Sequence, residues 1–192
     1  MTFSTILADP PWPYRGTAVV GSGGRGDCNG RAAEFIQVGL ADHYPSMSIN
    51  AIKELPIASM ADKQAHLYLW TTNSFMVEAH EIAEAWGFQQ KTIIAWGKVK
   101  KDEPGTPSMK TGYYYRSATE HLLFCTRKNM RLRGPCRPTL FLLPRDKHSK
   151  KPDFFYELIE EQSPGPYLEL FARRPRAGWD QWGNEIESTV TL

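Results

Sequence analysis

The chain has 192 residues, of which 41% are hydrophobic, 12% aromatic and 23% charged, and its formal net charge is +2. This composition is ordinary for a globular protein and excludes a disordered or fibrous chain. The length favours a single domain over residues 1–192. No apolar run approaches the roughly 20 residues of a membrane-spanning helix, and no signal peptide is recognisable at the N-terminus. We therefore expect a cytoplasmic protein that does not contact membranes.

The cysteines and histidines do not form a recognisable ligand pattern. The chain has three cysteines and five histidines, all scattered singly. Disulfide frameworks and zinc sites use regularly spaced or paired residues of these types. We expect neither a disulfide framework nor a metal site.

The hydrophobic pattern predicts strands that alternate with helices. A short apolar strand at residues 3–8 ends abruptly at two prolines, which cannot continue it. The other strands are expected at 66–71, 91–96, 119–126, 139–143 and 167–172, and the helices at 48–55, 73–86 and 152–162. Such alternation predicts an α/β fold with a largely parallel sheet, whose ligands bind beyond the carboxyl ends of the strands.

Local residues predict where the helices begin. Ser48 is expected to cap the first helix, and Asn73 or Ser74 the second, because short polar side chains bond the orphan amides of a first turn. Pro152 suits the first helical position of the third helix, where its missing N–H costs nothing.

Two segments are predicted to be loops. The glycine-rich stretch 21–26 lacks the Lys-Ser/Thr ending of a phosphate-binding loop, so we expect a mobile loop instead. Such a loop after a strand end suits an active-site lid or a plain insertion. Residues 98–112 are rich in proline, glycine and charge and are also expected to be a loop.

Basic residues gather in three stretches, which suit either solvated loops or contacts with nucleic acid. These stretches are Arg127, Lys128, Arg131, Arg133 and Arg137; Arg145, Lys147, Lys150 and Lys151; and Arg173, Arg174 and Arg176.

The tetrapeptide Asp9-Pro10-Pro11-Trp12 carries the strongest chemical signal. Its two prolines remove backbone donors and stiffen the turn, so the Asp9 carboxylate and the Pro10 carbonyl are both expected to accept hydrogen bonds in the crevice at the end of the sheet. Two adjacent acceptors suit an amino group. Trp12, and with it Tyr14, offers a ring for stacking on a planar base. An ordinary Asp-Pro turn beside a buried tryptophan is the structural alternative.

This tetrapeptide resembles the catalytic motif of the DPPW-type adenine-N6 methyltransferases, the MT-A70 family, which includes mRNA-modifying and DNA-modifying enzymes. The similarity continues in order over almost the whole chain. The further matching segments are residues 43–48, 69–73, 94–98, 119–124, 149–153, 169–173 and 178–185.

The resemblance implies a Rossmann-like, S-adenosylmethionine-dependent methyltransferase fold with permuted motif order, in which the catalytic tetrapeptide precedes the cofactor-binding strand. Arg173 and Asn184 would contact the cofactor ribose, and Glu185 would supply a second partner for its hydroxyls. Lys151 would lie near the methionine carboxylate or the catalytic aspartate. Glu169 and Phe171 belong to the cofactor motif, which here lacks the usual glycine-rich turn.

The resemblance also implies a nucleic-acid substrate. A target adenine must be flipped out of a duplex or presented in a single strand, and Tyr14, Arg116 and Glu120 are candidate substrate contacts. DNA is preferred because the short chain resembles bacterial and phage members. The alternatives are an RNA adenine-N6 methyltransferase, a catalytically silent nucleic-acid-binding subunit and a small-molecule amine methyltransferase. The enzyme would act alone, as a homodimer or with a partner subunit.

Overall fold

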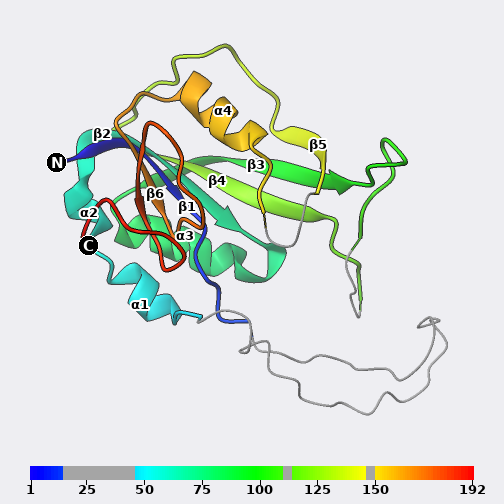
Figure 1. The fold of residues 1–192 in the computed structure, drawn as a ribbon, viewed down its shortest axis with the longest axis horizontal. Helices are drawn as coiled ribbons and strands as arrows, with labels where there is room; N and C mark the ends of the chain where they lie inside the picture. The colour runs from blue at the N-terminus through cyan, green and yellow to red at the C-terminus, as the bar shows by residue number, and fades with distance from the viewer. Residues whose placement is uncertain (15–45, 110–113, 146–149) are drawn as a thin grey trace.

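The computed structural model describes residues 1–14, 46–109, 114–145 and 150–192 (Figure 1). The expected glycine-rich loop at 21–26 lies outside these residues. The described helices are α1 (Ile49–Lys53), α2 (Ile57–Met60), α3 (Met76–Ala85) and α4 (Phe154–Gln162), with a short 3-10 turn, η2 (Asn73–Phe75).

The described strands form one seven-stranded sheet in the order β5-β3-β4-β2-β1-β6-β7. They are β1 (Phe3–Ala8), β2 (Ala61–Thr71), β3 (Gln89–Val99), β4 (Thr119–Arg127), β5 (Leu140–Pro144), β6 (Tyr167–Leu170) and β7 (Trp179–Trp182). Neighbouring strands are parallel except at β4, which runs antiparallel to both β2 and β3. The prediction of a largely parallel α/β sheet is therefore confirmed.

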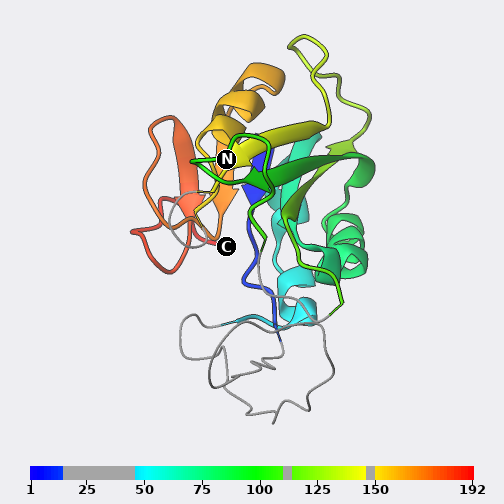
Figure 2. The same cartoon turned by 90° about the vertical axis from the view of Figure 1, so that its right-hand side faces the viewer.

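Helices cover both faces of the sheet, with α4 on one face and α1 and α3 on the other (Figures 1 and 2). The alternation of side chains along the strands divides the core accordingly. Ile6 and Ala8 of β1 pack in the cluster that includes α3, whereas Leu7 packs in the cluster under α4. Each apolar strand thus contributes to two cores, which explains why the central strands read as continuous hydrophobic runs.

Several predicted boundaries need correction. The strand expected at 66–71 begins at Ala61, and the strand expected at 91–96 extends from Gln89 to Val99. Lys98 therefore belongs to a strand and not to the loop expected at 98–112. The four-residue strand β7 was not predicted, because its sequence Trp-Asp-Gln-Trp has no apolar run and it is a strand only through pairing with β6.

The helix caps were predicted with mixed success. The prediction for Ser48 is confirmed, because its Oγ accepts the Ala51 N–H at 3.2 Å. The prediction that Asn73 or Ser74 caps the next helix is wrong, since α3 begins at Met76 without a side-chain cap. The Oδ1 of Asn73 instead lies 2.5 Å from the Nε2 of His121 on β4, a partner that only the folded sheet brings near.

The prediction for Pro152 is also wrong, because α4 begins two residues later, at Phe154. The Pro152 carbonyl accepts the Phe155 N–H at 3.1 Å, so this proline shapes the approach to the helix from outside it.

The strand directions decide which loops can meet. All strands except β4 end at one edge of the sheet, which we call the carboxyl edge, and β4 begins there. The segments after β1, β5 and β6 and the segment before β4 therefore converge at this edge. The segment after β4 leaves from the opposite edge, together with the first of the three basic stretches.

Candidate active site

An ion pair joins Asp9, directly after β1, to Lys151, shortly before α4. The Lys151 Nζ donates to the Asp9 Oδ2 at 2.6 Å, and the two side chains are 16% and 27% exposed. Burial by itself would lower the pKa of Lys151, but the negative charges of Asp9 and Glu120 outweigh it and hold that pKa above its ordinary value. The ammonium therefore stays protonated over the neutral range.

Glu120, near the start of β4, extends this pair into a chain of four charges. Its Oε2 lies 3.4 Å from the Lys151 Nζ, while its Oε1 accepts a hydrogen bond from the Nζ of Lys98 at the end of β3. Lys98 is only 5% exposed. Asp9, Lys151, Glu120 and Lys98 thus alternate in sign, and this charge chain holds two ammonium groups out of most of the solvent through paired carboxylates.

The two ammonium groups of the charge chain each lie over a tryptophan ring. Lys151 Nζ lies 5.2 Å from the centre of the Trp70 ring, and Lys98 Nζ lies 4.8 Å from that of Trp96. Both distances allow cation–π attraction. Because Trp70 of β2 and Trp96 of β3 are packed in the core under α4, the positions of the two lysine ammonium groups depend on the packing of this core.

The proline turn after Asp9 is tightly held by the backbone. The Pro10 carbonyl accepts the Trp12 N–H at 2.9 Å, and the Pro11 carbonyl accepts the Met47 N–H at 3.0 Å. A carbonyl oxygen has two lone pairs and a carboxylate about four acceptor positions. The Pro10 carbonyl and the Asp9 carboxylate therefore each retain acceptor capacity for a further donor.

Trp12 and Tyr14 differ in their availability for stacking. Trp12 is 7% exposed and its ring stacks on Phe75 at 5.1 Å and 14°, so in this structure the ring already has an aromatic partner. Tyr14 is 49% exposed; its ring meets Phe75 edge-on at 4.9 Å, and its hydroxyl lies 3.0 Å from the Thr72 Oγ1. Burial is the main cause that raises the pKa of Tyr14, so its hydroxyl remains protonated.

Strand β6 brings the expected cofactor motif beside the Asp9-Pro10-Pro11-Trp12 tetrapeptide. It lies parallel to β1, with Ala8 opposite Leu170. Glu169 points into the core under α4, where it is buried and accepts hydrogen bonds from the Tyr156 hydroxyl at 2.5 Å and the Gln181 Nε2 at 2.6 Å. Burial outweighs these hydrogen bonds and raises its pKa. In this structure Glu169 joins α4, β6 and β7.

The turn after β6 contains an unusual backbone conformation. Phe171 has a φ of 62°, a backbone conformation that bulky residues seldom adopt. Strained conformations of this kind are found mostly at functional sites. Its ring meets the Trp182 ring edge-on at 5.4 Å. Phe171 thus occupies, at the end of the strand, the left-handed position that a glycine would adopt without strain.

Close packing between the ends of β6 and β7 brings together further expected cofactor residues. A Cβ on Gly183 would lie 2.1 Å from the Ala172 carbonyl oxygen, so only glycine permits this approach. Directly beyond it, the Glu185 Oε1 lies 3.5 Å from the Arg173 Nε, and Asn184 is exposed beside them. Arg173, Asn184 and Glu185 therefore form a half-exposed group of donors and acceptors, which we call the Arg173 cluster.

Sequence reasoning placed most of the site at the correct edge but missed several of its members. Arg116 is exposed and makes no recorded contact with the charge chain within the described residues. Lys98, Phe75, Tyr156 and Gln181 were not singled out. A lysine at the end of an otherwise apolar strand was the available signal for Lys98, whereas the other three are recognisable only from their contacts.

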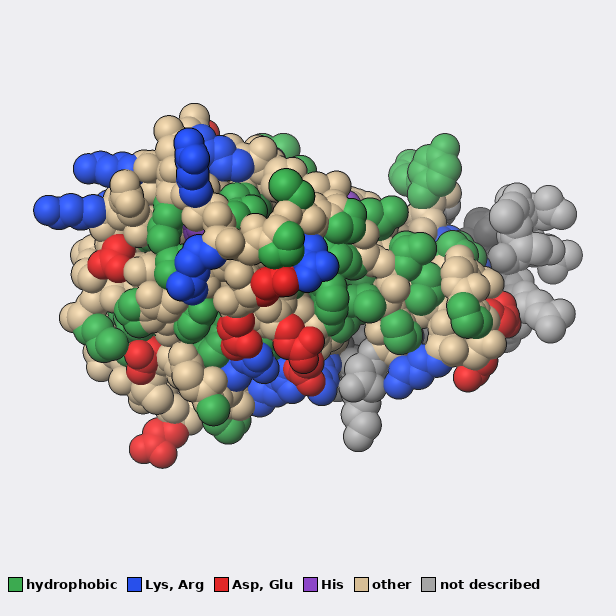
Figure 3. Space-filling model, turned by 90° about the horizontal axis from the view of Figure 1, so that it is seen from above, with side chains coloured by type: hydrophobic (Ala, Val, Ile, Leu, Met, Phe, Trp, Pro, Cys, Tyr) green, Lys and Arg blue, Asp and Glu red, His purple; other side chains and the backbone are tan. Residues whose placement is uncertain are grey.

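Several arginines of the basic stretches pair with other groups of the chain. Arg127 donates to the carbonyl of Ala58 at 2.8 Å, Arg137 pairs with Glu161, and Arg176 forms a two-pronged pair with Glu160 at 2.9 Å. On the face shown in Figure 3, basic and acidic side chains lie side by side over α4. Within the described residues, Arg145, Lys150 and Lys151 of the second stretch follow β5 to the carboxyl edge, and the third stretch follows β6 there, so these remain the better candidates for nucleic-acid contact.

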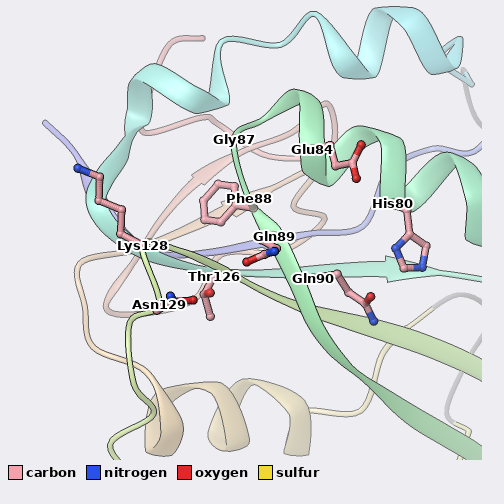
Figure 4. A pocket seen from close by; sticks show the side chains of 9 residues that line it. All are labelled: His80, Glu84, Gly87, Phe88, Gln89, Gln90, Thr126, Lys128 and Asn129. Carbon is pink, nitrogen blue, oxygen red and sulfur yellow. The ribbon is translucent and has the colours of Figure 1, made fainter.

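A shallow pocket of about 390 Å³ lies at the opposite edge of the sheet (Figure 4). His80 and Glu84 of α3, Gln89 and Gln90 of β3 and the turn after β4 line it. It is separate from the charge chain. Within the described residues, no cluster of His, Cys, Asp and Glu could hold a metal ion, and no helix is long and apolar enough to cross a membrane.

The Rossmann-like sheet, with hydrogen-bond acceptors after β1 and the Arg173 cluster after β6 and β7, is typical of the class of α/β methyltransferases. The chain belongs to the MT-A70 family, whose model matches residues 3–185. This match confirms the family, the fold class and the expectation of a methyltransferase that the motifs indicated.

Relatives of three kinds share this similarity. A type II methyltransferase M.MunI from a Mycoplasma species is 29% identical over 96% of this chain and 78% of its own. An N6-methyladenosine RNA methyltransferase MTA1 from Cryphonectria parasitica is 28% identical over 96% of this chain and 52% of its own. The N(6)-adenosine-methyltransferase subunit METTL3 of Danio rerio is 25% identical over 99% of this chain but only 29% of its own.

Proposed function

We propose that this chain is an S-adenosylmethionine-dependent methyltransferase that modifies N6 of adenine in DNA. Membership of the MT-A70 family supports adenine-N6 methylation. The observation that carries the proposal is the turn after β1, where the Asp9 carboxylate and the Pro10 carbonyl both retain acceptor capacity beside a protonated lysine. Two fixed acceptors are what an exocyclic amino group with two N–H donors requires.

The residues at the carboxyl edge suit S-adenosylmethionine by the chemistry of their donors and acceptors. The Arg173 guanidinium and the Glu185 carboxylate can donate to and accept from the hydroxyls of a ribose, and the exposed Asn184 amide can do both. Lys151 supplies a cation for the methionine carboxylate. The missing Cβ of Gly183 keeps this group next to the turn of Phe171. When bound, the cofactor would supply an electrophilic methyl group and a sulfonium leaving group, whose bond to the methyl carbon breaks to give a neutral thioether.

Asp9 and Pro10 would orient and activate the amine. The lone pair of an adenine amino group is delocalised into its ring, so hydrogen bonds from its N–H groups to two fixed acceptors would favour the geometry in which that pair is available. Positioning of this kind supplies much of the catalysis. The nitrogen loses a proton after it forms the new bond to carbon. Since Asp9 is 27% exposed, that proton can pass to solvent.

DNA is the preferred polymer because the chain matches a larger fraction of the type II methyltransferase than of the RNA methyltransferase. The chain covers 78% of the Mycoplasma type II methyltransferase but 52% of the fungal RNA methyltransferase. A second copy or a partner subunit remains part of the proposal, since the fish relative is named as a subunit. The RNA methyltransferase, the silent binding subunit and the small-molecule enzyme are the competing functions.

Parallel assays of labelled methyl transfer to DNA and to RNA test the proposal. We expect N6-methyladenine in digested DNA from the wild type, and a loss of about 100-fold or more for Asp9→Asn, the magnitude typical of misplaced reacting groups. Cofactor binding, measured by calorimetry, should persist in that variant. Methyl transfer to RNA alone would contradict the choice of DNA as the substrate. Cofactor binding without transfer would support a silent nucleic-acid-binding subunit. Methylation of small amines alone would favour a small-molecule amine methyltransferase.

A further inference from the structure

Two adjacent aromatic side chains project from the segment that precedes β4. Tyr114 is 89% exposed and Tyr115 is 94% exposed, which makes them the most exposed aromatic residues in the described parts of the chain. Aromatic side chains provide large apolar surfaces whose burial is favourable. A pair of them left in solvent is therefore a candidate contact surface for a partner.

This pair lies at the carboxyl edge, on the same side as the charge chain. The Lys98 N–H donates to the Ala118 carbonyl at 2.7 Å, which ties the segment to the end of β3. Two residues further along, Glu120 meets Lys151. Glu120 follows Tyr115 by five positions, so the chain allows at most roughly 18 Å between their Cα atoms at about 3.6 Å per residue.

We propose that Tyr114 and Tyr115 form a stacking platform for the nucleobases that flank the target adenine. This inference rests on the proposed nucleic-acid substrate. A strand from which one base has been flipped exposes the faces of neighbouring bases, and aromatic side chains stack on any base because every base has a π face. The exposed Arg116 directly follows the pair and can contact the adjacent phosphate.

The charge and position of the segment favour a nucleic-acid strand over an apolar partner. A protein interface or a membrane surface would need a larger apolar patch than two side chains, and the exposed Arg116 gives the pair a basic neighbour. The platform would bind without sequence specificity, since stacking does not read base edges.

Binding of a fluorescein-labelled single-stranded oligodeoxynucleotide with one adenine tests the platform. Fluorescence anisotropy would compare the wild type with Tyr114→Ala/Tyr115→Ala and Tyr114→Phe/Tyr115→Phe, at one salt concentration. Leu132→Ala, which truncates an exposed apolar residue after β4, is the matched control. A second oligonucleotide carries abasic sites on both sides of the adenine. Calorimetry of S-adenosylmethionine binding checks that every variant retains its cofactor site.

We expect the double alanine variant to bind the intact oligonucleotide about tenfold more weakly, the order of effect that loss of base stacking produces, and the phenylalanine variant and Leu132→Ala to bind it normally. The wild type should bind the abasic oligonucleotide more weakly than the intact one, whereas the alanine variant should bind both with equal affinity. Equal affinity of wild type and alanine variant, or an equal loss in the phenylalanine variant, would overturn the platform alone. A wild type that binds the cofactor but no oligonucleotide would contradict the nucleic-acid substrate as well.

Discussion

The ammonium of Lys151 lies 2.6 Å from the carboxylate of Asp9, although 142 residues separate them in the chain. This contact fastens the approach to α4 to the end of β1. It also places a permanent positive charge, stabilised by two carboxylates, beside the group proposed to hold the substrate amine. The geometry of the proposed active site therefore depends on the sheet as a whole.

Lys98 and Glu120 should be energetically coupled. Lys98→Met would leave Glu120 with Lys151 as its remaining partner in the charge chain, so we expect a loss of about 1–3 kcal/mol in the free energy of unfolding, below the cost of a fully unpaired buried charge. Glu120→Gln in the same background should restore part of this loss. Urea unfolding of the four proteins of the double-mutant cycle measures the coupling, and additive effects would show that the pair is not coupled.

Arg173 and Arg174 allow a comparison between neighbours. Arg173 pairs with Glu185 in the Arg173 cluster, which we propose binds the cofactor ribose, whereas Arg174 pairs with Asp153 near the start of α4. Arg173→Ala should weaken S-adenosylmethionine binding about tenfold or more, since hydrogen bonds to charged groups are worth roughly 1.5–3 kcal/mol. Arg174→Ala should weaken it less. Isothermal titration calorimetry measures the affinity of each variant for S-adenosylmethionine. Equal losses of affinity in the two variants would contradict a contact between Arg173 and the cofactor ribose.

Gly183→Ala should disturb the ends of β6 and β7. Its Cβ would lie 2.1 Å from the Ala172 carbonyl oxygen and 2.7 Å from the Ala172 nitrogen, so the two segments must separate. We expect a loss of about 1–3 kcal/mol in the free energy of unfolding, the usual cost of overpacking, together with weaker cofactor binding. Unfolding curves and calorimetry would be compared with wild type; unchanged values for both would show that the close approach is unnecessary.

His66 should make the protein less stable on the acid side of neutrality. Burial is the main cause that lowers its pKa below the ordinary 6.5, and its ring nitrogens contact the Ser163 hydroxyl at 2.8 Å and the Met130 carbonyl at 3.0 Å. The unfolded chain therefore takes up a proton more readily. The stability that His66 contributes is present above pH 6.5 and is lost as the pH falls through the lower folded-state pKa.

Urea unfolding at several pH values between 7.5 and 5.5 checks this expectation for His66. His66→Gln should show a flatter pH dependence than wild type, even though loss of the buried ring lowers its stability throughout. His80→Gln, which replaces a histidine on α3 outside this network, is the matched control. An unchanged slope in His66→Gln would assign the acid sensitivity to other groups.

Local sequence was sufficient for the elements whose signals are local. The apolar run that ends at two prolines predicted β1 and the turn that follows it, because proline removes backbone donors wherever it stands. The cap at Ser48 was predictable for a similar reason, since its partner, the Ala51 amide, is three residues away. The ordered motifs also identified the family, because they are linear features of the chain.

Tertiary structure alone decided how these features meet. The antiparallel direction of β4 sends the first basic stretch to the opposite edge and brings Glu120 to Lys151. The stacking of Trp12 on Phe75 and the bonds from Tyr156 and Gln181 to Glu169 join segments whose spacing in the chain is irregular. Such contacts depend on strand order, direction and register, which hydrophobic patterning within a single segment does not determine.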